Sequence, residues 1–290
     1  MSKSIKSPLL TKNEVIHNRG IVLIKIPRTG SQSFLRTIVC SCVNKKVENY
    51  HRYRLEEVFD QTMSLKLWSD LHNRPEMKGV LRWDKMRKAG HNLLLDSPTA
   101  WDVGGQLFRE RQLEIIGDKK YKILMSHWPW SYKPDIYRRI MVSDNPVTIT
   151  LLREPAKRVL SLYFYNFRRD ADLTKANLDD FEAYLDFYDS NYYARWLSYP
   201  STKIDFSTAK KNLEEKITLV GITERFNDFV DLCHKKINLG QYYSHVNKID
   251  SPFTLDDLPE RVKKKLYKKT EEDYELYQIA RKRFEKDFNS

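Results

Sequence analysis

The sequence has few cysteines and no long hydrophobic run. Among its 290 residues are three cysteines, Cys40, Cys42 and Cys233, which are too few for the disulfide framework of a small secreted domain. No apolar stretch is long enough for a signal peptide or a membrane span, and there is no Asn-x-Ser/Thr glycosylation sequon. These absences predict a soluble, cytoplasmic protein in a reducing compartment, without a membrane partner.

Acidic residues are outnumbered by basic ones, 39 to 51, which gives a formal net charge of +12. A positive field of this size suits anionic ligands such as nucleotides, nucleic acid or sulfated sugars, but it does not choose among them. Much of the excess lies in runs such as residues 261–269, which we interpret as a solvated helical face. The net charge of the protein therefore predicts that the ligand is an anion, but not which class of anion it is.

The chain is long enough to bury a substantial core, and we expect one domain over residues 1–290. Residues 1–19 are predicted to be a polar leader, and residues 44–117 a weakly patterned insertion. We find no internal repeat and no low-complexity tract.

Short apolar runs separated by helical patterns predict an α/β fold. The first strand, turn and helix are expected within residues 20–43, and further strands over 121–126, 146–153 and 217–222. Helices are expected over residues 154–169, 173–189, 191–197, 223–233 and from Leu258 onward. Short strands alternating with helices favour a parallel sheet covered on both faces.

The segment Pro27-Arg-Thr-Gly-Ser-Gln-Ser33 lies between the first strand and its helix. Backbone N–H groups at such a turn point outward at the positive end of a helix dipole, where a phosphate or sulfate binds. An ordinary turn capped by Ser31 or Ser33 is the alternative. The nucleotide phosphate-loop pattern is absent, because Lys25 stands at its first glycine and no Gly-Lys pair follows.

Ionisable residues follow the other predicted strands. His127 follows the second strand, Arg153 the third and Thr223-Glu-Arg225 the fourth, and ligands of parallel sheets bind at these carboxyl ends. Arg153 and Ser161 are two helical turns apart, so they could hold a second phosphate together. The alternative is that Arg153 pairs with Glu154 or Asp144.

These segments resemble those of sulfotransferases that use 3′-phosphoadenosine 5′-phosphosulfate (PAPS). Residues 27–33 resemble the family's 5′-phosphosulfate loop, residues 151–165 its 3′-phosphate motif, and Met125-Ser-His-Trp128 the Gly-His segment of the 2-O-sulfotransferase-like branch, which acts on heparan sulfate and related acceptors. Supportive matches lie at residues 191–197, 220–229, 245–248 and 273–280, in the family's order over about 20–285. The expected fold is a P-loop-NTPase-like three-layer sandwich, with a central, mainly parallel sheet of about 4–5 strands.

The resemblance implies transfer of a sulfuryl group from PAPS to a hydroxyl, or an amine, of a small metabolite or glycan, leaving PAP. Stabilising the leaving phosphosulfate is the main electrostatic task, and His127 would be the general base. No metal is expected, since no cluster has ligand spacing. The candidate catalytic residues are His127, Arg28 and Lys25; the PAPS-binding candidates are Arg28, Thr29, Gly30, Ser31, Gln32, Ser33, Arg153, Ser161, Asn247 and Lys248. The acceptor-binding candidates are Trp128, Trp130, Tyr132, Tyr163, Tyr165, Arg168 and Arg195. We expect about half of the aromatic residues among them to be packing residues instead.

The sequence departs from the family pattern in its first loop. Arg28 stands where the family has a lysine that is thought to assist the leaving group. Arginine keeps the charge but does not readily give up a proton, so either Arg28 acts by electrostatics alone or Lys25 contributes. Gln32 replaces a hydroxyl residue, and Glu154 replaces an aspartate.

Two other functions stay open. A P-loop-like kinase of a nucleotide or metabolite shares the strand-loop-helix core, but the missing Gly-Lys pair disfavours it. A basic nucleic-acid-binding protein agrees with the net charge, but no recognised binding motif occurs, so no nucleic-acid partner is expected.

Overall fold

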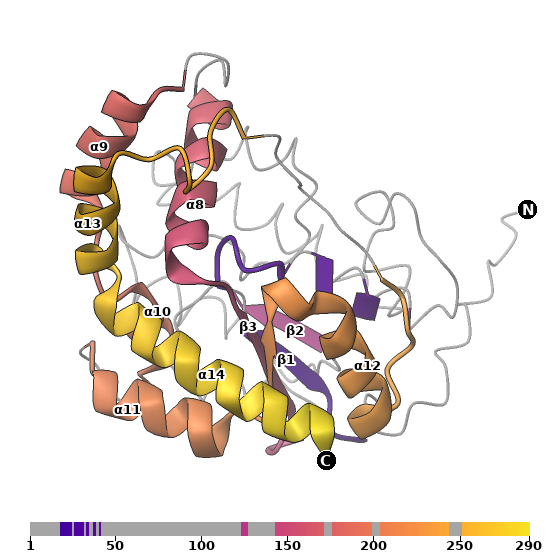
Figure 1. Cartoon of the computed structure of the whole chain (residues 1–290). Coiled ribbons are helices and arrows are strands. Elements are labelled where there is room, and N and C mark those ends of the chain that lie inside the picture. The colour runs from indigo at the N-terminus through magenta and orange to yellow at the C-terminus, as the bar shows by residue number, and fades with distance from the viewer. Residues whose placement is uncertain are drawn as a thin grey trace, which may run out of the picture.

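The computed structural model describes residues 18–24, 26–31, 33–34, 37–38, 41, 123–126, 143–170, 176–198, 204–243 and 251–290. These residues form a four-stranded parallel sheet in the order β2-β1-β3-β4 (Figure 1). The strands are β1 (Ile21–Ile24), β2 (Ile123–Ser126), β3 (Val147–Leu152) and β4 (Leu219–Ile222). The predicted α/β class is confirmed, while the P-loop-like three-layer arrangement stays a prediction.

The two central strands are buried along their whole length, as strands covered on both faces are. Ile24 at the end of β1 pairs with Thr150 of β3, so both strands reach the same edge of the sheet. The Thr150 hydroxyl donates a hydrogen bond of 3.2 Å to the Ile24 carbonyl oxygen, which satisfies a polar group in the core. The residues that follow β1 and β3 therefore emerge side by side.

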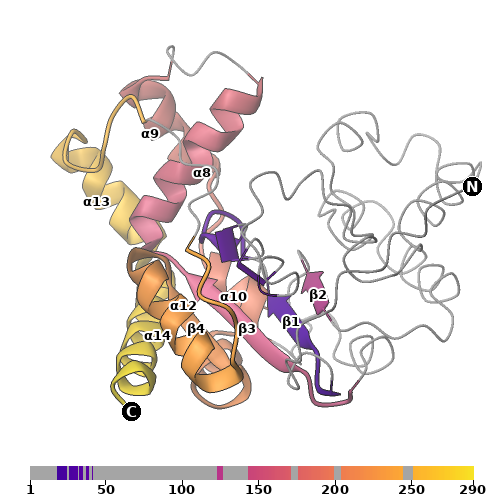
Figure 2. The same cartoon turned by 90° about the vertical axis from the view of Figure 1, so that its right-hand side faces the viewer.

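The helices divide into two groups around this sheet (Figure 2). Beyond its carboxyl edge lie α8 (Pro155–Asp170), α9 (Leu178–Phe187) and α13 (Glu260–Lys269). Helices α12 (Phe226–Ile237) and α14 (Glu271–Asn289) pack on β4, and α14 also contacts α10 (Tyr192–Leu197) and α11 (Phe206–Lys211). A π-helical turn, η4 (Asn212–Lys216), precedes β4, and a 3-10 turn, η5 (Thr223–Arg225), follows it.

Helix α12 lies directly on β4 because Gly221 has no side chain. A Cβ built at Gly221 would lie 2.5 Å from the Phe229 ring, closer than any packed contact. Phe229 also packs against Phe34, with ring centroids 5.0 Å apart. Any larger residue at position 221 would push α12 off the sheet.

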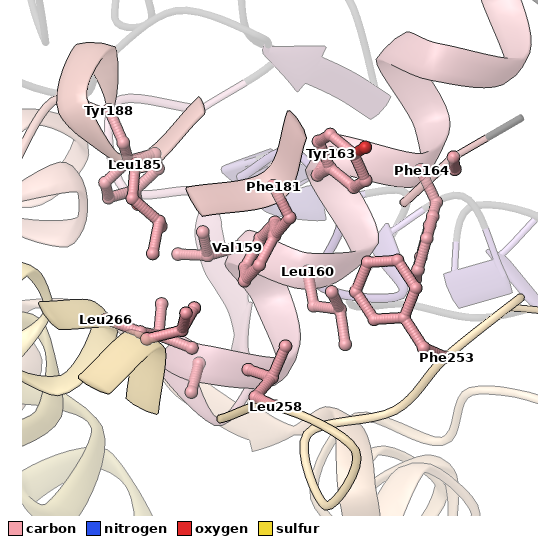
Figure 3. Close-up of a cluster of buried hydrophobic side chains, with 13 residues drawn as sticks. Val159, Leu160, Tyr163, Phe164, Phe181, Leu185, Tyr188, Phe253, Leu258 and Leu266 are labelled. Carbon is pink, nitrogen blue, oxygen red and sulfur yellow. The ribbon is translucent and has the colours of Figure 1, made fainter. Parts of the chain in front are cut away.

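A hydrophobic cluster holds the first helix group together (Figure 3). Val159, Leu160, Tyr163 and Phe164 of α8 belong to this cluster with side chains of three other parts of the chain. Phe181 and Leu185 lie on α9 and Tyr188 directly follows it; Phe253 and Leu258 precede α13, and Leu266 lies on α13. Helix α8 is thereby fixed at the end of β3, and its first turn is capped by the Glu154 carboxylate, which accepts from the N–H groups of Ala156 and Lys157 at 3.2 and 3.0 Å.

Three predicted helix boundaries are wrong. Helix α9 begins at Leu178 and not at residue 173, because the extended Asn177 caps it by accepting a hydrogen bond from Asp180 N–H. The helix predicted from Thr223 starts as a 3-10 turn and continues to Ile237, where Asn238 ends it in a left-handed conformation. The C-terminal helical region is broken at Thr270, whose hydroxyl bonds the carbonyl oxygen of Leu266.

The predicted insertion at 44–117 lies outside the described residues, as does the predicted leader except for its last two residues. Among the helices in the described ranges, none combines the length and the apolar character that crossing a bilayer requires. The cytoplasmic location and the single-domain organisation stay predictions.

Candidate functional site

The loop after β1 is tied back to the strand end by its own hydroxyl groups. Thr29 Oγ1 donates to the carbonyl oxygen of Ile26 at 2.8 Å, and Ser31 Oγ lies 3.3 Å from the same oxygen. Phe34 N–H then donates to the Gly30 carbonyl oxygen at 3.1 Å, a hydrogen bond of the helical type. The described part of the predicted anion turn is therefore a compact strand-to-helix loop whose hydroxyls brace it.

Thr223, the first residue after β4, fixes this loop against the sheet. Its hydroxyl lies 2.6 Å from the carbonyl oxygen of Thr29 and 3.0 Å from that of Leu152 at the end of β3. Gly30 has φ +78°, and a Cβ there would lie 3.3 Å from the Thr223 methyl carbon. In the sequence, Thr223 is marked only by its position at the end of a predicted strand, and this position is the feature that points to a role at the site.

Arg28 connects this loop to helix α8. Its Nε donates a hydrogen bond of 3.1 Å to Ser161 Oγ, and its guanidinium carbon lies 4.7 Å from the centroid of the Tyr165 ring. The backbone of Arg28 has φ +70°, in the left-handed region that side-chain-bearing residues rarely adopt. The structure thus brings Arg28, predicted for a 5′-phosphate loop, into contact with Ser161, predicted for a 3′-phosphate motif.

Arg153 leaves β3 at the same edge and is held by its backbone. Its N–H donates to the phenol oxygen of Tyr193 at 3.2 Å, and the Tyr193 hydroxyl donates to the Arg153 carbonyl oxygen. Burial lowers the pKa of Arg153, and the Glu224 carboxylate offsets part of that effect by Coulomb attraction. The alternative partner, Glu154, instead uses its carboxylate to cap α8. Among the described residues, no carboxylate forms an ion pair with Arg153.

Glu224 stands beside this arginine with both carboxylate oxygens engaged. Oε1 accepts from Glu154 N–H at 3.0 Å, and Oε2 accepts from the Tyr277 hydroxyl at 3.2 Å. Burial, together with this carboxylate, raises the pKa of Tyr277. Glu224 therefore links β4, the start of α8 and α14 around the arginine.

Asp273 anchors the helix that carries Tyr193. It is fully buried and accepts from the N–H groups of Tyr192 and Tyr193 at 3.1 and 2.7 Å. Burial raises the pKa of Asp273 to about 6, although the nearby Arg158 and the two N–H groups pull the pKa down. Nothing in the sequence distinguished this aspartate from other helical acidic residues, except its place in a segment that resembles the sulfotransferase family.

The other predicted site residues differ in their surroundings. Tyr163 is 4% exposed, lies in the cluster of Figure 3 and donates to the Asn177 carbonyl oxygen, so it is a packing residue. Arg195 forms an ion pair of 3.0 Å with Asp189. Ser33 is buried in the helical segment after the loop. Outside the described part lie Lys25, Gln32, His127, Trp128, Trp130, Tyr132, Asn247, Lys248 and the side chain of Arg168.

The chain is similar to a heparin sulfate O-sulfotransferase of Drosophila melanogaster. The two are 22% identical over 275 residues, which cover 84% of this chain and 63% of the relative, so the match spans less than two thirds of the relative's length. No protein-family model matches the chain. The similarity supports a relationship to sulfotransferases without assigning a branch.

Within the described ranges, no group of three or more His, Cys, Asp or Glu side chains is arranged to hold a metal ion. The chemistry available at the described edge of the sheet is that of fixed positive charge and hydroxyl donors, supplied by Arg28, Arg153 and Ser161.

Proposed function

We propose that this protein is a PAPS-dependent sulfotransferase that moves a sulfuryl group to a hydroxyl, or an amine, of a glycan or smaller metabolite. The observation that carries the proposal is the hydrogen bond between Arg28 and Ser161, beside Arg153 at the same edge of the sheet. Two loops that emerge side by side thereby supply two guanidinium groups, in a chain similar to a heparin sulfate O-sulfotransferase.

The described residues suit a ligand with two separated anionic groups. Ser161 Oγ accepts from Arg28 Nε, which directs the hydroxyl proton away from Arg28 and leaves it to donate to a phosphate oxygen. Arg153, without an ion-pair partner in the described residues, offers a planar pair of donors that matches phosphate. When bound, PAPS supplies the sulfuryl group; Arg28 and the loop residues Thr29, Gly30, Ser31, Gln32 and Ser33 would bind its 5′ side, and Arg153, Ser161, Asn247 and Lys248 its 3′ side.

We assign the proton transfer to His127, which would take the proton of the acceptor's hydroxyl. Because Arg28 Nε is bound to Ser161 and arginine does not readily lose a proton, we assign Arg28 an electrostatic role. The assistance that a lysine gives in the family then falls to Lys25. Trp128, Trp130, Tyr132 and Arg168 remain the acceptor-binding candidates, whereas Tyr163 packs in the core and Arg195 is engaged by Asp189.

A glycan is the favoured acceptor class. The Drosophila relative is named for a sulfated glycan. The net charge of +12 on this chain would attract an anionic polysaccharide of that kind. The P-loop-like kinase stays the second candidate, since the described fold is compatible with it.

The direct test is transfer of ³⁵S from labelled PAPS to a panel of acceptors: desulfated heparan sulfate, an uncharged oligosaccharide and a simple phenol. We expect label on the desulfated polysaccharide, loss of turnover in His127→Ala and full turnover in His234→Ala, a histidine exposed on α12. PAP should bind the His127→Ala variant with near wild-type affinity. Unchanged turnover in His127→Ala would refute the assigned base, and phosphate transfer from ATP would overturn the proposed function.

A further inference from the structure

We propose that Tyr165 is a positioning residue that holds the Arg28 guanidinium over the nucleotide site, and not an acceptor-binding residue. The inference rests on the proposed function, since it takes the 5′-phosphosulfate side of PAPS as the anion that Arg28 faces. Its basis is the contact between the Arg28 guanidinium and the Tyr165 ring, 4.7 Å from carbon to centroid.

Ser161 and Tyr165 lie one helical turn apart on α8, so both side chains project from one side of the helix. Arg28 reaches this side from the β1 loop: its Nε donates a hydrogen bond to Ser161, and its guanidinium carbon lies over the Tyr165 ring. The neighbours Tyr163 and Phe164 are buried in the core cluster, whereas Tyr165 is 43% exposed. Tyr165 is therefore placed by its contact with Arg28 more than by core packing.

The two contacts together fix the orientation of the guanidinium. The Nε hydrogen bond holds one edge of the group, and the contact with the ring restricts how far the rest of the group can move. Fixing a long side chain before the ligand arrives reduces the entropy lost on binding. The Arg28 backbone has φ +70°, and from it the side chain reaches Ser161 on α8.

This arrangement also explains why arginine suits position 28, where the family has lysine. A lysine has a single nitrogen, whereas arginine can bond Ser161 through Nε and still has two further nitrogens on the same rigid group. The contacts with Ser161 and Tyr165 thus favour arginine at this position. The expected cost of removing the ring is modest, because a cation–π contact at a half-exposed site is weak.

The test compares four variants by calorimetric titration with PAP. Tyr165→Phe keeps the ring and should bind PAP like the wild type, whereas Tyr165→Leu keeps only apolar bulk and should bind about two- to fivefold more weakly. In an Arg28→Met background, Tyr165→Leu should have no further effect, because methionine has no cation and the contact with the ring is already absent. A general structural role for Tyr165 would instead give the same loss in both backgrounds.

A second readout needs no nucleotide. The ¹⁵Nε–H signal of Arg28, assigned by its loss in Arg28→Lys, should shift in Tyr165→Leu and not in Tyr165→Phe, because the ring current acts on it. If wild-type protein binds PAP but Tyr165→Leu leaves both PAP affinity and this signal unchanged, the proposed positioning role is wrong. If Tyr165→Leu raises only the acceptor KM, Tyr165 is an acceptor residue. If the wild type does not bind PAP, the proposed function fails, and the Arg28 signal alone still decides whether Tyr165 holds Arg28.

Discussion

Tyr193 and Arg153 are joined by a reciprocal pair of hydrogen bonds: the Arg153 N–H donates to the phenol oxygen at 3.2 Å, and the phenol donates to the Arg153 carbonyl oxygen. Tyr193 is fully buried, and its own N–H is held by Asp273 of the C-terminal helix at 2.7 Å. A side chain on α14 therefore determines where the residue after β3 sits. These hydrogen bonds connect Asp273, on the C-terminal helix, through Tyr193 to Arg153 at the proposed 3′-phosphate site.

Tyr193→Phe removes the hydroxyl group, and with it the hydrogen bonds to the Arg153 N–H and carbonyl oxygen. We expect the free energy of unfolding to fall by about 1–3 kcal/mol, because buried polar groups lose hydrogen bonds, and we expect weaker PAP binding. Urea unfolding and calorimetric titration measure the two effects, with Tyr274→Phe, a 45% exposed tyrosine, as control. A less stable variant with wild-type PAP affinity would show that Tyr193 supports the fold without positioning Arg153.

Arg28→Gly separates stability from binding. Glycine adopts the φ of +70° found at Arg28 without steric strain, which stabilises the folded state. It also raises the conformational entropy of the unfolded chain, which opposes this effect, so the free energy of unfolding should change by less than about 1 kcal/mol. PAP affinity should fall clearly, since the guanidinium is lost. Urea unfolding and PAP titration on the same sample check both parts. A large loss of stability with normal PAP affinity would mean that Arg28 is structural.

The raised pKa of Asp273, about 6, predicts a pH-dependent stability. Between pH 4 and pH 6 the unfolded chain releases this proton while the folded protein keeps it, so the folded state binds more protons and its stability falls as pH rises. The contribution is fully present below the unfolded-state pKa, near 4, and is lost through pH 6. It amounts to about 2–3 kcal/mol, from a shift of roughly two pKa units.

Urea unfolding of wild type and Asp273→Asn at pH 4, 5, 6 and 7 measures this effect. The difference between the two curves cancels the other carboxylates and should change sign or shrink toward neutral pH, because asparagine has no proton to lose. A constant difference across this range would contradict a raised pKa at Asp273.

The sheet was predictable because its strands are short, buried and rich in branched residues. Residues 146–153 predicted β3, and Glu154-Pro155 marked the start of α8, where the carboxylate does cap the helix. The strand ends followed from the parallel topology, which placed Arg28, Arg153 and Thr223 at one edge. These features depend on the local sequence, so the pattern of apolar and polar residues predicts them.

The links between these residues were not predictable. The bond of Arg28 to Ser161 spans 133 residues, and that of Tyr193 to Asp273 spans 80. Such contacts depend on how the helices pack, and the spacing of apolar residues within one segment does not determine that packing. The left-handed backbone at Arg28 was also missed, because arginine gives no signal for a conformation that glycine normally marks. The roles of His127 and Lys25 stay predictions, since both lie outside the described residues.

Arg153→Ala tests the proposed anion site through charge at one position. It should remove most of the stabilisation that PAP gives, whereas Lys157→Ala, an exposed lysine one turn along α8, should keep it. Thermal unfolding with and without PAP provides the comparison. Equal losses in both variants would indicate that net charge, and not a specific site, attracts the nucleotide.

Ligand-dependent thermal stability tests whether the carboxyl edge of the sheet binds PAP, the sulfotransferase nucleotide. The wild-type protein is heated with PAP, with ATP and Mg²⁺, or with a DNA oligomer, each at the same concentration and ionic strength. A ligand that binds only the folded state raises the melting temperature. We expect PAP alone to raise the melting temperature; a larger rise with ATP and Mg²⁺ would show that the site is not that of a sulfotransferase.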